Sequence, residues 1–343
     1  MSGRALSECQ EQKVKREAFL HPIWEEYPKI NADLFAVRSL MHTQLKVSVP
    51  DIQAKIDQYI DAGGKYLRSG LCLIFSAHQN EDRSSVFEKA AALEILHLAT
   101  LVHDDVIDLS PERRGITTLQ VEKSNRIAIY AGDYLLAYAG RLFLKNYVKA
   151  DFSLTTKYGI EGILRGEIRQ ELDRYNLHGS FRQYLKRIQG KTALIFGLAC
   201  ASGLDFSVSN LHELKQAFYV GNQIGLAFQL LDDLADFRSM NQSQGKPLLQ
   251  DVKNGIYTAP ILILRDRIGE ERLATILPKS RERWTEDQQK ELLTLMDEEK
   301  VLDRVERLIK LYVLKAKNRT KKEFGEDLVN QLAPLLDRIF SGQ

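Results

Sequence analysis

The strongest constraint on the fold of this chain is its lack of proline. Its 343 residues include 8 prolines, and none of these lies between residues 114 and 246. Proline disrupts the interior of a helix, so a long proline-free stretch leaves room for long helices. Apolar residues also recur at helical spacing, as at Val301, Val305 and Leu308, whereas alternating runs typical of strands are scarce. The sequence therefore predicts an all-α protein, and 44% hydrophobic residues can supply a large core.

The predicted domain organisation follows from the places where the helical pattern stops. Gly63 and Gly64 separate two helical stretches, and residues 241–247 and 277–287 have the composition of loops. No low-complexity linker divides the chain. We therefore expect a single helical domain over residues 26–343, preceded by a loosely ordered extension at residues 1–25.

The overall composition excludes several classes of protein. The 48 basic and 46 acidic residues nearly balance, which argues against a nucleic-acid partner. Cys9, Cys72 and Cys200 lie far apart, so neither a disulfide framework nor a cysteine metal site is expected, and a reducing compartment is favoured. A charged N-terminus without an apolar segment, and no apolar run of about 18 residues, predict a cytoplasmic protein without a transmembrane helix.

Two acidic clusters are the most informative motifs. The stretches "LVHDDVID" (101–108) and "LLDDLAD" (230–236) share the spacing Asp-Asp-x-x-Asp. Acids one turn apart on a helix repel each other, so a chain that keeps them in an apolar segment needs a compensating cation. An EF-hand is excluded because its alternating oxygen ligands and central glycine are missing. A solvated charged face would explain one cluster, but two apolar clusters favour Mg²⁺ ions that bridge to a phosphorylated substrate.

Basic residues suited to an anionic substrate accompany these clusters. In "GGKYLRS" (63–69), two glycines allow close backbone approach to a ligand, and Lys65 and Arg68 supply donors for a diphosphate. Arg113 and Arg114 follow the first cluster. The alternative for this arginine pair is a solvent-facing position that only balances the aspartates.

Two further candidates are the stretch "GKTAL" (190–194) and a histidine. The stretch resembles the end of an NTPase phosphate loop, but the glycine required upstream is absent, so an NTPase is rejected. Lys191 and Thr192 stay candidates for phosphate binding on a helix. His97 lies two helical turns before Asp104 on the same face. That alignment favours contact with a ligand over the alternative of a packed core histidine.

Together these motifs resemble the trans-isoprenyl (polyprenyl) diphosphate synthase family, of the medium- or long-chain type. The resemblance runs from about residue 30 to residue 265 and includes the blocks "AGDYLLA" (131–137), "GNQIGLAFQLLDDLADF" (221–237) and "GKPLLQDVKNGIYTAP" (245–260). Four places depart from the family pattern. Tyr66 stands where the family has a basic residue, Ser69 where it has proline, and Leu248-Leu249 where it usually has a small residue. Ala235 stands where the family has a larger apolar residue, and the three acids of that cluster are intact.

The resemblance implies a fold, a reaction and a set of residue roles. The fold is the isoprenoid synthase fold, with antiparallel helices around a large central cavity, and the reaction is Mg²⁺-dependent 1′–4 condensation of isopentenyl diphosphate with an allylic diphosphate. Isopentenyl diphosphate would be held by Lys65, Arg68, His97 and Arg114. The allylic diphosphate would be held by Arg113, Lys191, Thr192, Gln229 and Lys246. Several metal ions would be bound, directly or through water, by Asp104, Asp105, Asp108, Asp232 and Asp236.

The chemistry of these residue types agrees with that reaction. Mg²⁺ and cationic side chains stabilise the departing pyrophosphate, and apolar walls keep water from the carbocation. No Ser–His or Cys–His nucleophile is needed. We assign catalysis to Asp104, Asp105, Asp108, Lys191 and Asp232.

Product length is predicted from the residues that precede the first cluster. Ala99 and Thr100 lie about one turn before Asp104, and both are small. Leu96 lies one turn earlier still in the chain. In the family a bulky aromatic residue here closes the cavity, so small residues predict a product in the hexaprenyl to nonaprenyl range. If another helix sets the floor of the cavity, a short-chain geranylgeranyl diphosphate synthase is the alternative.

Two other functions and the partners were also considered. A class I terpene cyclase would not need a second diphosphate pocket, and a non-catalytic partner subunit would lack the aspartates. We expect a homodimer, with the catalytic member of a two-component synthase that needs a small regulatory subunit as the alternative. Membrane contact is expected to be transient at most, for release of the product.

Overall fold

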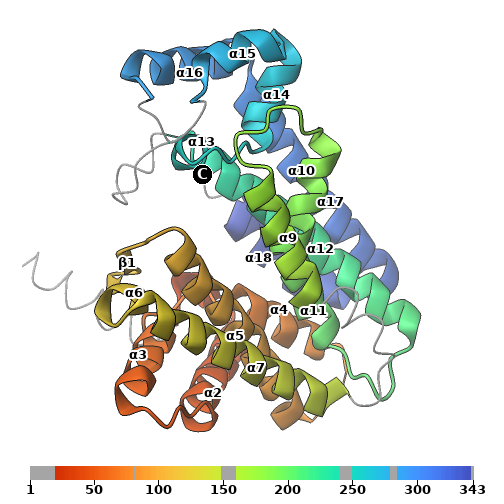
Figure 1. Ribbon diagram of the computed structural model, residues 1–343. Helices are drawn as coiled ribbons and strands as arrows, with labels where there is room; N and C mark the ends of the chain where they lie inside the picture. The colour runs from red at the N-terminus through yellow and green to blue at the C-terminus, as the bar shows by residue number, and fades with distance from the viewer. Residues whose placement is uncertain (1–19, 80–81, 148–159, 239–248, 279–283, 341–343) are drawn as a thin grey trace, which may run out of the picture. The chain divides into compact units, whose positions relative to one another are not determined.

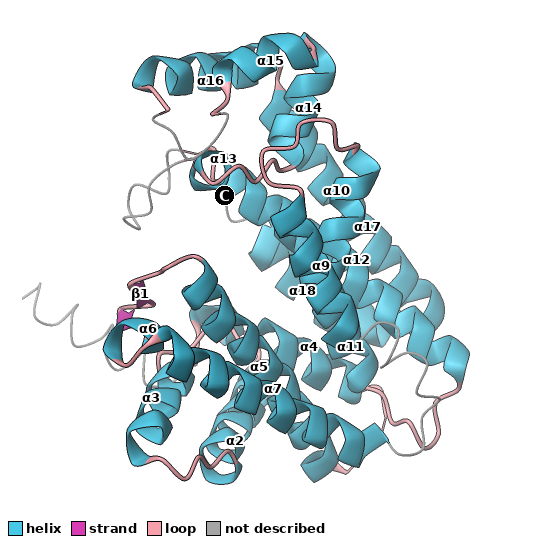
Figure 2. Ribbon diagram, viewed as in Figure 1, coloured by secondary structure: helices cyan, strands magenta, loops and turns pink. Residues whose placement is uncertain are grey.

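The computed structural model describes residues 20–79, 82–147, 160–238, 249–278 and 284–340. Helices make up most of these residues, and a short strand lies beside α6 (Figure 2). The predicted all-α class is confirmed. The chain groups into two compact units: unit 1 is Met1–Asp151 with Ala199–Leu214, and unit 2 is Phe152–Leu198 with Lys215–Gln343. The single domain predicted for residues 26–343 stays a prediction, and most of the extension predicted for residues 1–25 lies outside the described residues.

Unit 1 consists of helices and one small antiparallel hairpin. Its elements are η1 (Pro22–Trp24), α2 (Pro28–Gln44), α3 (Pro50–Asp61), α4 (Leu67–Ser76), α5 (Arg83–Ile107), β1 (Glu112–Arg113), β2 (Ile116–Thr117), α6 (Leu119–Glu122) and α7 (Asn125–Tyr147). The break predicted at Gly63-Gly64 is confirmed, since α3 ends at Asp61 and α4 begins at Leu67.

Unit 2 contains the remaining helices, and two of them cross the boundary between the units. They are α9 (Ile160–Leu172), α10 (Phe181–Ile188), the π-helical turn η2 (Gln189–Ala193), α11 (Leu194–Ser202), α12 (Leu211–Ala235), α13 (Gln250–Lys253), α14 (Ala259–Ile268), α15 (Glu270–Ile276), α16 (Glu286–Glu298), α17 (Val301–Phe324) and α18 (Glu326–Phe340). The loop predicted at residues 241–247 lies outside the described residues. None of the described helices has the length and apolar character needed to cross a membrane.

The core of unit 1 is built around α5. This helix runs alongside α7 (Figure 1) and also packs on α2 and α4. The side chains of Ala90, Ala91 and Ala92 are completely buried, which lets the neighbouring helices approach closely. The apolar faces of α5 therefore fix the helix on several sides and determine where its C-terminal aspartates emerge.

The N-terminal edge of α4 is fixed by a buried tryptophan. Trp24 is completely buried, and a Cβ on Gly70 would lie 2.0 Å from its ring, so only glycine fits there. The indole Nε1 of Trp24 donates a hydrogen bond to the carbonyl oxygen of Lys65 at 2.8 Å. The segment before α2 thus supports the glycine-rich loop from behind.

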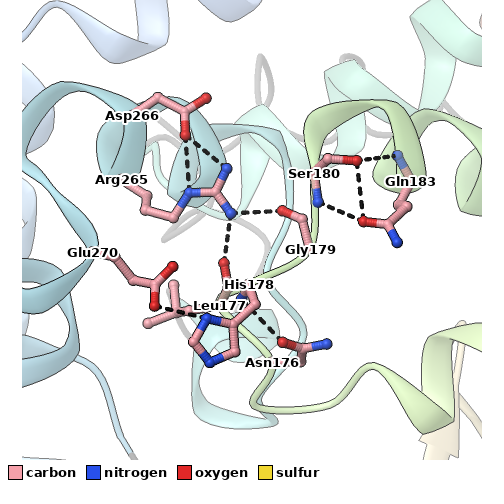
Figure 3. Close-up of polar contacts among 9 residues, drawn as sticks. All are labelled: Asn176, Leu177, His178, Gly179, Ser180, Gln183, Arg265, Asp266 and Glu270. Carbon is pink, nitrogen blue, oxygen red and sulfur yellow. Dashed lines mark hydrogen bonds and ion pairs between the residues drawn. The ribbon is translucent and has the colours of Figure 1, made fainter.

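In unit 2, an arginine joins the connection between α9 and α10 to α14. Arg265 donates through Nη1 to the carbonyl oxygens of Leu177, at 2.5 Å, and Gly179, at 2.6 Å (Figure 3). His178 in the same connection lies 2.8 Å from Glu270. α10 then begins with a capping box between Ser180 and Gln183, which satisfies amides of its first turn. These contacts fix where α10 begins, one turn before Tyr184, whose hydroxyl binds Asp233 of the second aspartate cluster.

Candidate active site

The first aspartate cluster lies at the C-terminal end of α5, and its middle member is the anchored one. Asp105 is 2% exposed, and both Nε and Nη2 of Arg113 lie 2.7 Å from its Oδ1. Arg113 can reach back because the chain turns after α5, where Leu109 has φ of 53°, before β1 begins at Glu112. Asp104 is half-buried and Asp108 is exposed, so these two acids lie at the accessible end of the helix.

The environment of Asp105 leaves one of its oxygens available. Burial raises the pKa of Asp105, and the Arg113 guanidinium opposes that rise. Its Oδ2 is buried and accepts no hydrogen bond. Gln120 stabilises the turn that follows, because its Nε2 donates to the carbonyl oxygens of Asp105 and Ser110 at 2.7 and 2.8 Å.

The second cluster, at the end of α12, also anchors its middle acid. Asp233 is 1% exposed and accepts hydrogen bonds from the Tyr184 hydroxyl at 2.5 Å and from Gln229 Nε2 at 3.0 Å. Burial raises the pKa of Asp233 to about 6. Asp232 is exposed. The pattern of one anchored acid beside an accessible one therefore occurs in both clusters.

Asp236, the last acid of the second cluster, binds the start of α13. Asp236 accepts from the backbone amides of Gln250, at 2.9 Å, and Asp251, at 3.2 Å, and so holds the start of α13. Burial raises the pKa of Asp236, and these two amides oppose the rise. Burial also raises the pKa of Asp251, with Asp236, Asp233 and Asp232 adding to it.

The predicted phosphate ligands of unit 2 gather around the π-helical turn. Lys191 Nζ lies 3.0 Å from Glu167 Oε2, and Thr192 Oγ1 donates to Gln229 Oε1 at 2.6 Å. A Cβ on Gly166 would lie 2.5 Å from the Lys191 nitrogen, so α9 must carry glycine where it meets the turn. Gln229 thereby links the turn to Asp233. Lys246 lies outside the described residues.

The predicted isopentenyl diphosphate ligands surround a small pocket of unit 1. The pocket, of about 30 Å³, is lined by Gly63, Gly64, Tyr66, Glu94, His97 and Arg114 among others. The Arg114 guanidinium donates to the Gly63 carbonyl oxygen, and a Cβ on Gly64 would lie 2.8 Å from it. Burial lowers the pKa of His97 well below its usual range, and the charges of Arg68 and Arg114 lower it further. His97 is therefore a neutral histidine among cations. Lys65 is exposed and is not one of the residues that line the pocket.

The three candidates for chain-length control are placed differently. Ala99 is completely buried and Leu96 is 1% exposed, so both belong to the packed interior of unit 1. Thr100 is half-buried and donates through Oγ1 to the carbonyl oxygen of His97 at 2.8 Å. It lies one turn before Asp104 on the same face.

Sequence reasoning missed Glu94, Glu167 and Asp251. Glu94 lies one turn before His97 on α5, Glu167 lies beside Lys191, and Asp251 lies beside Asp236. The spacing of Glu94 before His97 was the one available signal. The other two pairs join segments far apart in the chain or follow a loop, and no local spacing reveals them.

The residues fit a magnesium site of the kind that a substrate completes. Among the described residues, no group of three or more histidine, cysteine, aspartate or glutamate side chains is arranged to hold a metal ion. Magnesium commonly binds through one or two carboxylates together with water and substrate phosphates. Asp104 with Asp108, and Asp232 with Asp236, offer oxygen ligands of that type one helical turn apart.

Comparison with known proteins decides the family. The model of the family described as polyprenyl synthetase matches residues 49–296, which is most of the chain. The chain belongs to this family. The chain is also 33% identical over 237 residues to "Heptaprenyl diphosphate synthase component 2" of Bacillus subtilis (strain 168). The match covers 69% of this chain and 68% of that protein.

Solved structures agree with this assignment. This chain superposes on a geranylgeranyl pyrophosphate synthase of Lactobacillus brevis with a TM-score of 0.84 and 29% sequence identity. The match covers 93% of this chain and 99% of that one. A heptaprenyl diphosphate synthase of Staphylococcus aureus gives a TM-score of 0.82 and 27% identity, with 91% and 98% covered. The predicted isoprenoid synthase fold and the prenyltransferase class are thus confirmed.

Proposed function

We propose that this prenyltransferase makes an all-trans polyprenyl diphosphate by successive 1′–4 condensation of isopentenyl diphosphate onto an allylic primer such as farnesyl diphosphate. The observation that carries the proposal is the paired design of the aspartate clusters. In each, one acid is buried and anchored, at Asp105 and Asp233, whereas an acid of the same cluster, Asp108 or Asp232, is exposed to solvent at the end of an apolar helix. Accessible acids on a fixed helix end are suited to ions that a substrate diphosphate shares.

In this mechanism the metal ions would be held by Asp104, Asp108, Asp232 and Asp236, and bound Mg²⁺ would supply positive charge for the departing pyrophosphate. Asp105 contributes its free Oδ2 while Arg113 keeps it in place. Lys191, Thr192 and Gln229, together with Arg113 and Lys246, orient the allylic diphosphate. The allylic C–O bond breaks, the isopentenyl double bond attacks that carbon, and the proton lost from the isopentenyl unit goes to the pyrophosphate.

Lys65, Arg68, His97 and Arg114 hold the second diphosphate. Because the pKa of His97 is lowered, its ring is neutral near pH 7 and donates a hydrogen bond without adding charge. The arginines supply the charge and can bind phosphate oxygens in a bidentate manner.

A long product, in the hexaprenyl to nonaprenyl range, is supported by the small Thr100 on the same face as Asp104. The relatives include both heptaprenyl and geranylgeranyl synthases, so a short-chain enzyme is the second candidate. Incubation with Mg²⁺, isopentenyl diphosphate and farnesyl diphosphate, followed by measurement of product length, tests the reaction and separates the two candidates. Absence of any elongated product would contradict the proposed function.

We further propose a homodimer formed through α7. Apolar and aromatic side chains are exposed along one face of this helix at Ile127, Tyr130, Tyr134, Ala137 and Leu144. The spacings are three, four, three and seven residues, and the exposed Arg141 lies within the last one. Such a stripe suits helix packing against a second copy. The alternative is a small partner subunit, because two relatives are named as component 2 of a heptaprenyl diphosphate synthase. Light scattering combined with the elongation assay on the isolated chain distinguishes these cases.

The remaining expectations concern location and membranes. We propose a cytoplasmic enzyme, as the scattered cysteines favour a reducing compartment, with brief membrane contact when a long product leaves. Cell fractionation followed by the elongation assay tests this location.

A further inference from the structure

A carboxylate stands among the cations of the isopentenyl diphosphate pocket. Glu94 lines this pocket together with His97 and Arg114. Burial lowers the pKa of both Arg68 and Arg114, and the charge of Glu94 opposes that fall. A negative group in an anion site would repel the substrate or bind the arginines in its place. Its position therefore requires an explanation in terms of what else holds it.

The contacts of Glu94 show that its carboxylate caps another helix. α4 begins after Tyr66, whose own side chain makes no capping hydrogen bond. Instead, Glu94 Oε1 accepts from the backbone amide of Ser69, in the first turn of α4, at 3.1 Å. Amides of the first turn have no partner within their helix and carry partial positive charge, so a carboxylate is favoured there.

The hydroxyl of Ser69 adds a second donor at the same oxygen. Ser69 Oγ lies 3.1 Å from Glu94 Oε1 and 3.0 Å from the carbonyl oxygen of Ala90, and its single proton is given to one of them at a time. Ser69 is completely buried. Proline at this position would have neither an amide hydrogen nor a hydroxyl, so it would remove both donors.

We propose that Ser69 and Glu94 form a positioning pair for isopentenyl diphosphate. This inference rests on the proposed function and adds two residues to it. Ser69 binds the carboxylate to the start of α4, so that Glu94 balances Arg68 and Arg114 from behind and does not form the bidentate pairs that the diphosphate needs. The arginines keep their separation and their fork geometry for the substrate.

Ser69→Pro is the most informative variant. Proline is tolerated in the first turn of a helix, and the amide of Ser69 has no partner within α4, so the fold is retained. Both donors to Glu94 are removed. The freed carboxylate then competes for Arg68 and Arg114, and we expect the Kd of isopentenyl diphosphate to rise about tenfold. The KM of the allylic substrate is expected to stay within twofold.

Glu94→Gln tests the charge with the same shape. We expect the Kd to rise about tenfold, because the two arginines lose the anion that balances their charges and keeps them in place. In Ser69→Pro/Glu94→Gln there is no charge left to restrain, so the double variant should be no weaker than Glu94→Gln alone, where independent effects would give about a hundredfold. Ser76→Ala removes a hydroxyl from the same helix, and Glu88→Gln removes a carboxylate from α5 at its pair with Lys145; both are controls expected to leave the Kd unchanged.

The measurements are calorimetric titration with isopentenyl diphosphate, steady-state elongation, and thermal unfolding of each variant. A wild-type chain that binds isopentenyl diphosphate, with unchanged Kd in Ser69→Pro and Glu94→Gln, overturns the positioning pair and leaves the proposed function standing. A lower Kd in Glu94→Gln also overturns the pair, since the carboxylate would then only compete with the substrate. A wild-type chain that neither binds nor elongates isopentenyl diphosphate overturns both.

Discussion

Asp105 and Asp233 occupy the same place in their clusters, yet the chain satisfies them with different chemistry. Asp105 faces a guanidinium, with two nitrogens at 2.7 Å, whereas Asp233 is held by a tyrosine hydroxyl, a glutamine and a more distant backbone amide. In the first cluster, burial raises the pKa of Asp105 and the charge of the guanidinium opposes that rise. The second leaves the pKa at about 6, because neutral donors offset burial only in part. One motif can therefore be supported by either an ion pair or a neutral network.

The largest expected effect comes from the accessible acids, where the two clusters should behave alike. Asp104→Ala and Asp232→Ala should each lower kcat by about a thousandfold or more, because each removes a carboxylate ligand of a metal ion that binds the diphosphate. Neither side chain is buried, so the midpoint of thermal unfolding should stay close to that of the wild type. Single-turnover elongation and a melting curve check both statements. A collapsed fold in either variant would contradict the assignment of these acids to the site.

The second largest effect is expected in the free energy of unfolding, because Asp105 is anchored by an ion pair and Asp233 by neutral donors. Arg113→Met leaves a buried carboxylate without its cation, and we expect the free energy of unfolding to fall by about 3 kcal/mol. Urea denaturation measures the change. The double variant Asp105→Asn/Arg113→Met removes both charges and should recover most of the loss. If Arg113→Met alone is as stable as the wild type, the ion pair does not support the first cluster.

Tyr184→Phe is the matching change in the second cluster. Asp233 keeps Gln229 after this substitution, so the loss in the free energy of unfolding should be smaller, about 1–2 kcal/mol. Tyr312→Phe, at a half-buried tyrosine of the same unit, is the control. A loss in Tyr184→Phe larger than that in Arg113→Met would reverse the comparison.

The residues one turn before each cluster differ as well, and they lead to a prediction on product length. Thr100 precedes Asp104, whereas Phe228 precedes Asp232 and lies against Phe196 at 5.3 Å between ring centroids. Thr100→Phe makes the first cluster like the second and should shorten the product toward geranylgeranyl diphosphate. The completely buried Ala99 is the contrast, because a phenylalanine there overpacks the core and should cost about 1–3 kcal/mol of stability. Unchanged chain length in Thr100→Phe would remove this residue from length control.

Local patterns predicted the parts of the fold and site that depend on local spacing. The all-α class, the break at Gly63-Gly64 and the placement of Asp104 and Asp108 at one helix end follow from periodicity and from glycine. The bond between Arg113 and Asp105 does not, because the two residues are separated by a turn in which Leu109 has a left-handed backbone. Glu94 on α5 contacts the start of α4, and Glu167 on α9 contacts Lys191 in η2. Each contact joins two separate helical elements, and a single sequence gives no sign of such pairs.

Trp24 has a spectroscopic use that follows from its position behind the glycine-rich loop. The chain has two tryptophans, and the other, Trp284, lies in a core cluster of unit 2 with Leu292 and Val301. Trp284→Phe would leave a single indole, hydrogen-bonded to the carbonyl oxygen of Lys65. Its fluorescence would then report on the backbone of the isopentenyl diphosphate loop without an added dye. Ligand binding at that loop could be followed in the intact enzyme in real time.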